Sequence, residues 1–167
     1  MSKHSPIPGL IISFSDSGWQ QALPDAESLI MHTLEVAVPH LPFDLRGTEI
    51  SVYLTDDEEV QELNKDYRGK NKPTNVLSFP QGEVPKGPNG EVHPLGDIVM
   101  AYETCVREAE DEGVPFKHHV SHLLVHGLLH LLGYDHEEEE DALEMEALEI
   151  EILKDLEIPN PYLAEEI

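Results

Sequence analysis

The sequence has a single cysteine among its 167 residues, and this scarcity limits its chemistry. One thiol, Cys105, cannot form an internal disulfide, so the chain does not resemble a small secreted disulfide scaffold. No apolar run approaches the ~20 residues needed to cross a bilayer, and residues 1–6 lack the apolar core of a signal peptide. The sequence therefore predicts a cytoplasmic protein without a membrane segment, in which Cys105 is a small buried residue.

Basic residues are also scarce, with 10 Lys and Arg against 34 Asp and Glu and a net charge of −24. This balance excludes the broad positive surface that is typical of nucleic-acid-binding domains. Residues 137–167 are especially acidic, with 13 acidic side chains and one basic one. Four of the ten cations nevertheless fall within eight residues: Lys65, Arg68, Lys70 and Lys72. By charge alone, this segment is either a solvated helix end, which favours cations, or a local anion site.

Three histidines, His126, His130 and His136, stand at offsets of 0, 4 and 10 residues, with Gly133 between the last two. Residues four apart in a helix point the same way, so the first two can bind one metal ion from one face. The third cannot reach that ion from the same helix. Gly133 is where the helix can end, because glycine adopts the left-handed conformation that closes many helices. Three such ligands with a fourth position for water are typical of catalytic zinc.

The residue directly after the first of these histidines is Gly127. Zinc proteases with this histidine spacing carry a glutamate there as the general base. The ligand frame therefore resembles that of the metzincin proteases without their proteolytic base, and peptide hydrolysis is disfavoured. Zn2+ is the expected metal, and Ni2+ or another divalent ion also suits three imidazoles.

Other polar residues near the motif allow a structural or a functional interpretation. Four of the histidines follow one another at four-residue steps, a spacing that can also arise by chance. We expect His122 to support a ligand or line the pocket, and His118 and His119 to form a solvated helix start. Asp135 is predicted to cap the last helix, with Glu138 three residues on as in a capping box. Alternatively, Asp135 orients a ligand histidine or the metal-bound water.

Hydrophobic periodicity divides the chain into alternating strands and helices. It predicts strands over 10–14, 49–54, 76–79 and 97–101, and helices over 25–38, 55–67, 102–112, 115–132 and 137–156. Residues 81–95, rich in proline and glycine, are expected to form a loop. These elements predict one domain over residues 1–167, of the α+β class with an α/β layer: a small four-stranded mixed sheet packed with helices.

Two helices carry more detailed expectations. A capping box from Thr55 to Glu58 is predicted to begin the second helix. An acidic helix and tail begin at about residue 137, and the predicted inner face of that helix is a stripe of apolar side chains. These side chains are Leu143, Ala147, Ile150 and Leu153.

Two segments together resemble the signatures of the YbeY family: Tyr-Arg-Gly-Lys-Asn-Lys-Pro-Thr-Asn-Val-Leu-Ser-Phe-Pro over 67–80, and the histidine motif over 126–136. Residues 96–99 and 145–149 fit the family as well, and the resemblance covers roughly residues 48–162. It implies a zinc-dependent, single-strand-specific endoribonuclease that acts in 16S rRNA 3′-end maturation and ribosome quality control. It also implies a four-stranded mixed sheet with about six helices and a metal cleft beside the sheet, here expected to be metzincin-like.

The resemblance assigns roles to particular residues. It implies His126, His130 and His136 as the metal ligands and Arg68 as the residue needed for activity. The implied partners are single-stranded RNA or rRNA and the ribosome or its small-subunit proteins, with no membrane and no DNA.

Phosphoryl chemistry suggests how such a site works. Zinc lowers the pKa of bound water to about 7, so hydroxide is available without a neighbouring glutamate. This hydroxide either attacks phosphorus or deprotonates the 2′-hydroxyl. Arg68 is the candidate for holding the phosphate oxygens bidentately, with Lys70 and Lys72 on flanking phosphates and Ser78 lining the cleft. The alternatives are a metal-dependent hydrolase of another substrate, or a non-catalytic ribosome-associated RNA-binding factor with a structural zinc.

Overall fold

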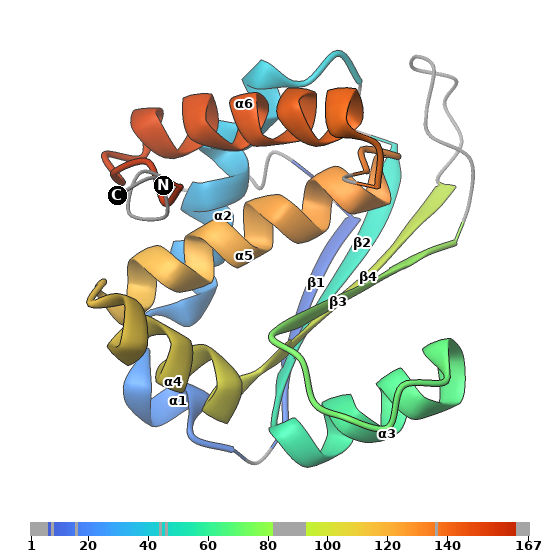
Figure 1. The fold of residues 1–167 in the computed structure, drawn as a ribbon, viewed down its shortest axis with the longest axis vertical. Coiled ribbons are helices and arrows are strands. Elements are labelled where there is room, and N and C mark those ends of the chain that lie inside the picture. The colour runs from blue at the N-terminus through green and yellow to red at the C-terminus, as the bar shows by residue number, and fades with distance from the viewer. Residues whose placement is uncertain are drawn as a thin grey trace.

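The computed structural model describes residues 7, 9–15, 17–43, 45, 47–81, 93–135 and 137–162 (Figure 1). The strands are β1 (Gly9–Phe14), β2 (Thr48–Thr55), β3 (Val76–Pro80) and β4 (His93–Ala101). The helices are α1 (Trp19–Ala22), α2 (Ala26–Ala37), α3 (Asp57–Arg68), α4 (Tyr102–Glu112), α5 (Phe116–Leu131) and α6 (Glu139–Asp155). A short 3-10 helix, η1 (Val38–His40), follows α2.

The four strands form one mixed sheet in the order β1-β2-β4-β3. The pairs β1–β2 and β2–β4 are parallel, and β3 runs antiparallel to β4. Parallel neighbours require long crossover connections, and the intervening helices supply them. The prediction of an α+β fold with a four-stranded mixed sheet is therefore confirmed. Within the described residues, β3 forms one edge of the sheet.

Helices lie against both faces of this sheet. Helix α5 packs on β3 and β4 and is itself contacted by α2, α4 and α6, so that it runs through the interior as an all-round apolar helix should (Figure 1). Helix α3 instead packs in a second, smaller cluster with Val60, Leu77, Val99 and Ala101. Although α5 is mostly apolar, no helix in the described part of the chain is long and apolar enough to cross a membrane.

Strand β4 begins at His93, four residues before the predicted start. The register between β2 and β4 shifts between Glu49 and Ile50, and the extra pairing extends the ladder through Pro94. Gly96 lies at this irregularity with a φ of 151°. Pro94, which was counted in the predicted loop over 81–95, thus belongs to an irregular strand end, where proline is tolerated.

The start of α3 differs from the prediction by one residue. The N-cap is Asp56, whose Oδ1 accepts a hydrogen bond from the backbone N–H of Glu59 at 2.8 Å. Thr55 belongs to β2, and its hydroxyl donates to the Glu59 carboxylate at 2.7 Å. The box from Thr55 to Glu58 is therefore wrong, although the residue types at the helix start were recognised correctly.

The inward face of α6 is also rotated from the prediction. Leu143 is 61% exposed, and the buried side chains are Met145, Glu149, Ile152 and Leu153. Leu153 is buried as predicted, but Leu143, Ala147 and Ile150 are not, and the carboxylate of Glu149 occupies one inward position in place of an apolar side chain. Glu149 is fully buried and hydrogen-bonded, which removes the usual objection to a charged residue inside.

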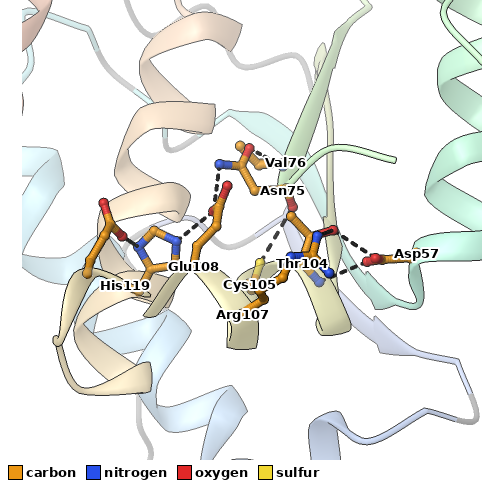
Figure 2. Close-up of polar contacts among 9 residues, drawn as sticks. Asp57, Asn75, Val76, Thr104, Cys105, Arg107, Glu108 and His119 are labelled. Atoms are coloured by element: carbon orange, nitrogen blue, oxygen red, sulfur yellow. Dashed lines mark hydrogen bonds and ion pairs between the residues drawn. The ribbon is translucent and has the colours of Figure 1, made fainter. Parts of the chain in front are cut away.

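Helix α4 ties three other elements together through polar contacts (Figure 2). The carboxylate of Asp57, at the start of α3, accepts hydrogen bonds from the backbone N–H and hydroxyl of Thr104 at 2.9 and 2.8 Å. Asn75, directly before β3, donates from Nδ2 to Glu108 at 3.0 Å. The same Glu108 oxygen lies 2.9 Å from Nε2 of His119 on α5. These contacts fix the chain where it enters β3.

His119 is only 6% exposed and lies between two carboxylates of α4, those of Glu108 at 2.9 Å and Glu112 at 3.4 Å. The expectation of a solvated helix start is therefore wrong for this residue, because α4 folds back over it. Cys105 is buried as predicted, and its thiol donates to the carbonyl of Asn75 at 3.6 Å. Burial raises the pKa of this thiol, which makes it a poor nucleophile.

The Glu108 carboxylate should make stability depend on pH. Burial by itself raises its pKa, but hydrogen bonds from His119 and Asn75 outweigh burial and lower the pKa below its usual range. Its stabilising effect is thus present above about pH 4.5 and is lost as the pH falls through the lowered value. We expect Glu108→Gln to reduce the free energy of unfolding at neutral pH. Between neutral and acid pH, the free energy of unfolding of this variant should fall less than that of the unmodified protein.

Urea unfolding of both proteins at about pH 7, 5 and 3.5 measures this difference. Glu110→Gln, an exposed position on the same helix, is the matched control and should leave the pH profile unchanged. A Glu108→Gln protein that loses the same free energy at every pH would contradict the expectation.

Candidate functional site

His126 and His130 lie one turn apart on α5 and point toward the same spot, as four-residue spacing dictates. Their Nε2 atoms are 3.0 Å apart, and both side chains are half-buried. Two imidazole nitrogens at this separation could hold a divalent metal ion between them. The structure therefore brings together two of the three predicted ligands.

The third predicted ligand, His136, lies outside the described residues. Helix α5 ends at Leu131, and Gly133 follows with a φ of 96°, the left-handed conformation predicted for the turn. Within the described residues, no three His, Cys, Asp or Glu side chains are arranged to hold a metal ion. The complete three-histidine set and its metzincin-like geometry stay predictions.

A buried carboxylate on α6 holds the first histidine. Glu149 has no exposed surface, and its Oε1 lies 2.5 Å from Nδ1 of His126. Its other oxygen accepts a hydrogen bond from the hydroxyl of Tyr162 and lies 3.5 Å from Nε2 of His122. Burial by itself raises the pKa of Glu149, but hydrogen bonds from these three partners outweigh it and lower the pKa to about 2.

The ionised state of Glu149 decides which nitrogen of His126 carries the proton. An ionised carboxylate can only accept hydrogen bonds, so the short contact requires N–H at Nδ1. In a neutral imidazole, this leaves the lone pair on Nε2, the atom that faces His130. His126 is thus presented in the tautomer that a metal ligand requires.

Gly127 brings α5 close to the sheet. A Cβ atom built on Gly127 would lie 3.1 Å from Cγ2 of Ile98 on β4 and 3.2 Å from Oγ of Ser78 on β3. The hydroxyl of Ser78 donates to the carbonyl of Gly127 at 3.0 Å, which fastens the two elements together. The position where zinc proteases carry glutamate therefore faces the packed sheet, where even a Cβ atom would require Ile98 or Ser78 to move.

Arg68, at the end of α3, reaches the same region from upstream in the sequence. Its Nη2 donates to the carbonyl of Ser78 at 3.2 Å, so Ser78 contacts both Arg68 and the histidine helix. Arg68, His126 and His130 line one cleft of about 550 Å3, which we call the histidine cleft. Its other lining residues are Thr74, Asn75, Val76, Ser78, Pro80, Gly133, Tyr134, Asp135 and Glu137.

The remaining predicted residues lie at different distances from this cleft. Asp135 lines it but does not cap α6, because its Oδ1 accepts from the backbone N–H of Glu137 at 3.2 Å and α6 begins with Glu138 as N-cap. His122 contacts Glu149 rather than the cleft. Lys70 and Lys72 are exposed, and neither lines the histidine cleft.

Sequence reasoning missed Glu149 and Tyr162 as functional candidates. A usable indication was present, because Glu149 stands four residues after Met145 and three before Ile152, in register with apolar positions. An acidic residue in register with a buried stripe suggests a partner inside. Tyr162 had no comparable indication, since it follows the last helix at a proline-rich segment.

Comparisons with known proteins show the family of this chain. Residues 12–157 match the family model described as Endoribonuclease YbeY. The chain belongs to the YbeY family. The Endoribonuclease YbeY of Rhodopseudomonas palustris (strain CGA009) is 48% identical over 163 residues, which cover 98% of this chain and 85% of the relative. That of Bradyrhizobium sp. (strain BTAi1) is 49% identical over 160 residues, covering 95% of this chain and 94% of the relative.

A solved structure shows the same fold. The solution structure of TM1509 from Thermotoga maritima aligns with a TM-score of 0.52 and 23% identity, over 89% of this chain and 91% of that one. At this identity the likeness concerns the fold alone. The resemblance to YbeY predicted from the two motifs is confirmed, and the family match includes the Arg68, histidine and Glu149 positions.

The packing of Gly127 allows a direct test of why this site lacks the protease base. We expect Gly127→Glu to destabilise the fold by about 3–5 kcal/mol, because its carboxylate would be buried without a partner. We also expect it to confer no casein hydrolysis. Chemical unfolding and a casein assay measure the two effects. Leu143→Glu, at a position 61% exposed, is the control and should cost less than about 0.5 kcal/mol. A stable Gly127→Glu protein that cleaves casein would refute this account.

Proposed function

We propose that this chain is a metal-dependent endoribonuclease that cleaves single-stranded RNA. One observation carries the proposal: the Arg68 guanidinium and the paired Nε2 atoms of His126 and His130 line the same cleft. Phosphodiester cleavage needs a group that compensates charge on the phosphate oxygens beside a source of nucleophile. The names of the curated relatives, each an Endoribonuclease YbeY, support the same activity.

His126, His130 and, from the sequence, His136 are the residues that would hold a zinc ion. Two nitrogens on one tetrahedral zinc lie about 3.3 Å apart when each Zn–N distance is about 2.0–2.1 Å. The observed separation of 3.0 Å is close to that value. When bound, zinc lowers the pKa of water to about 7 and so makes hydroxide available without a glutamate at position 127. Ni2+ or another divalent ion fits the same donors.

Arg68 is the residue that we assign to the phosphate. Its bond to the carbonyl of Ser78 uses one of five N–H donors and directs the guanidinium to the rim of the histidine cleft. The planar fork suits two oxygens of one phosphate, and it stays charged at every working pH. Held in this way, Arg68 compensates the negative charge that develops on the phosphate oxygens during cleavage.

We further propose that the substrate is ribosomal RNA. The family resemblance suggests cleavage in 16S rRNA 3′-end maturation and in ribosome quality control, in the cytoplasm and beside small-subunit proteins. A net charge of −24 repels RNA from most of the surface, so binding depends on the few local cations. Lys70 and Lys72, both exposed just beyond Arg68, can contact flanking phosphates.

Arg68→Ala tests the proposed activity. We expect it to lower cleavage of single-stranded RNA by at least about 100-fold, because the charge on the phosphate oxygens is no longer compensated. Zinc content should not change, since Arg68 bonds to Ser78 rather than to a histidine. The measurement compares single-stranded RNA, duplex RNA and casein as substrates, with and without a chelator, together with zinc content.

Two further proteins complete that experiment. His130→Ala should lose both zinc and cleavage, whereas Lys65→Ala, an exposed cation on α3 outside the histidine cleft, should cleave normally. Undiminished cleavage by Arg68→Ala would remove its proposed role. RNA cleavage that survives both the chelator and His130→Ala would remove the metal from the mechanism.

Glu149 should act on the metal through His126. We expect Glu149→Gln to weaken zinc affinity by about 10-fold or more, because a neutral amide holds the Nδ1 proton less firmly and lowers the basicity of Nε2. Competition with a chromophoric chelator measures the affinity without any RNA. Glu151→Gln, exposed on the same helix, is the matched control. Equal zinc affinities for Glu149→Gln and the unmodified protein would contradict this role.

A further inference from the structure

A second and larger cleft lies on the other side of the sheet from α5. It encloses about 860 Å3, with α3 as one wall and the strands as its floor, and we call it the sheet groove. Ser51 and Tyr53 of β2 line it, and they alternate with the buried Ile50, Val52 and Leu54. Because successive strand residues face opposite sides, the groove is the face that α5 leaves uncovered.

The sheet groove is continuous with the histidine cleft. Arg68, Ser78 and Pro80 line both the sheet groove and the histidine cleft, and the two hollows meet at β3, the edge strand. The Arg68 guanidinium bonds to the outward carbonyl of Ser78 on that strand, so it stands at the boundary between the two hollows. If a phosphate of an RNA strand lies at Arg68, the neighbouring nucleotide of that strand therefore lies at the mouth of the sheet groove.

The groove carries an aromatic platform beside Arg68. Tyr67 is 71% exposed, and its ring meets that of Phe79 edge-on, with centroids 5.3 Å apart and planes at 62°. Both side chains line the groove. Proteins bind single-stranded RNA by stacking splayed bases on such exposed aromatic rings.

The charges of the groove select a base rather than a phosphate. Two carboxylates, Glu59 and Asp97, line it, and they repel phosphate oxygens. A nucleobase is neutral and offers N–H donors to carboxylates as well as acceptors to the hydroxyl of Ser51. The cation at the rim and the acids on the floor thus match the phosphate and the base of one nucleotide.

We propose that the sheet groove binds an unstacked nucleobase of single-stranded RNA, next to the phosphate held by Arg68, with Tyr67 as the stacking platform. This inference rests on the proposed function and extends it. A base in a duplex stays paired and stacked and cannot enter the groove without breaking those contacts. The groove would then be the physical source of the preference for single strands.

Tyr67→Ala tests this platform by RNA binding, measured separately from cleavage. The probe is a fluorescein-labelled ten-nucleotide RNA of mixed, unpaired sequence, and anisotropy is followed after the chelator has stopped cleavage. We expect Tyr67→Ala to bind roughly 10-fold more weakly, whereas Tyr67→Phe keeps the ring and stays close to the unmodified protein. Without the chelator, Tyr67→Ala should raise KM by a similar factor and change kcat little.

Leu143→Ala is the matched control, since Leu143 is a large exposed side chain, 61% accessible, on the distant α6. Thermal unfolding confirms that each variant is folded. Tyr67→Ala that binds RNA and cleaves it like the unmodified protein overturns the groove proposal while endoribonuclease activity stands; a protein partner would then be the better occupant. An unmodified protein that neither binds nor cleaves the RNA overturns the proposed function, and this inference with it.

Discussion

The hydrogen bond between Glu149 and His126 is the interaction on which the site depends most. A carboxylate without exposed surface is tolerated only when its oxygens are fully engaged, and three side chains engage this one. That requirement fixes the rotation of α6 about its axis and its position along α5. It also holds the imidazole proton of His126 on Nδ1, which leaves the lone pair on Nε2. The contact between Glu149 and His126 therefore determines both how α6 packs on α5 and which nitrogen of His126 carries the proton.

A second constraint joins the histidine helix to the cationic segment upstream. Gly127 lets α5 approach the sheet until its carbonyl meets the hydroxyl of Ser78, while the carbonyl of Ser78 meets Arg68. Ser78 thus connects two short motifs that lie about sixty residues apart in the sequence. Helix α4 also stabilises this arrangement, because its Glu108 accepts a hydrogen bond from Asn75 where the chain enters β3 (Figure 2).

Much of this could be predicted from the sequence, because strands and interior helices follow from the periodicity of apolar residues. The pairing of His126 with His130 follows from helical spacing alone. The inward turn of Glu149 does not, since hydropathy assigns every carboxylate to the surface and only the fold reveals its partners. For the same reason His119 was assigned to solvent, although α4 covers it. The start of α3 lies one residue later than predicted because Thr55 completes β2 and Asp56 caps the helix.

The bond from Arg68 to Ser78 has a consequence beyond chemistry. An edge strand presents unpaired carbonyl and N–H groups to which a strand of another molecule can add. Strand β3 is such an edge within the described sheet, and the guanidinium occupies one of its outward carbonyls with a charged group. Lysines, arginines and other charges at sheet edges hinder this kind of self-association in many proteins. The contact between Arg68 and Ser78 therefore makes β3 a poorer template for a strand of another molecule, in addition to placing the guanidinium at the cleft.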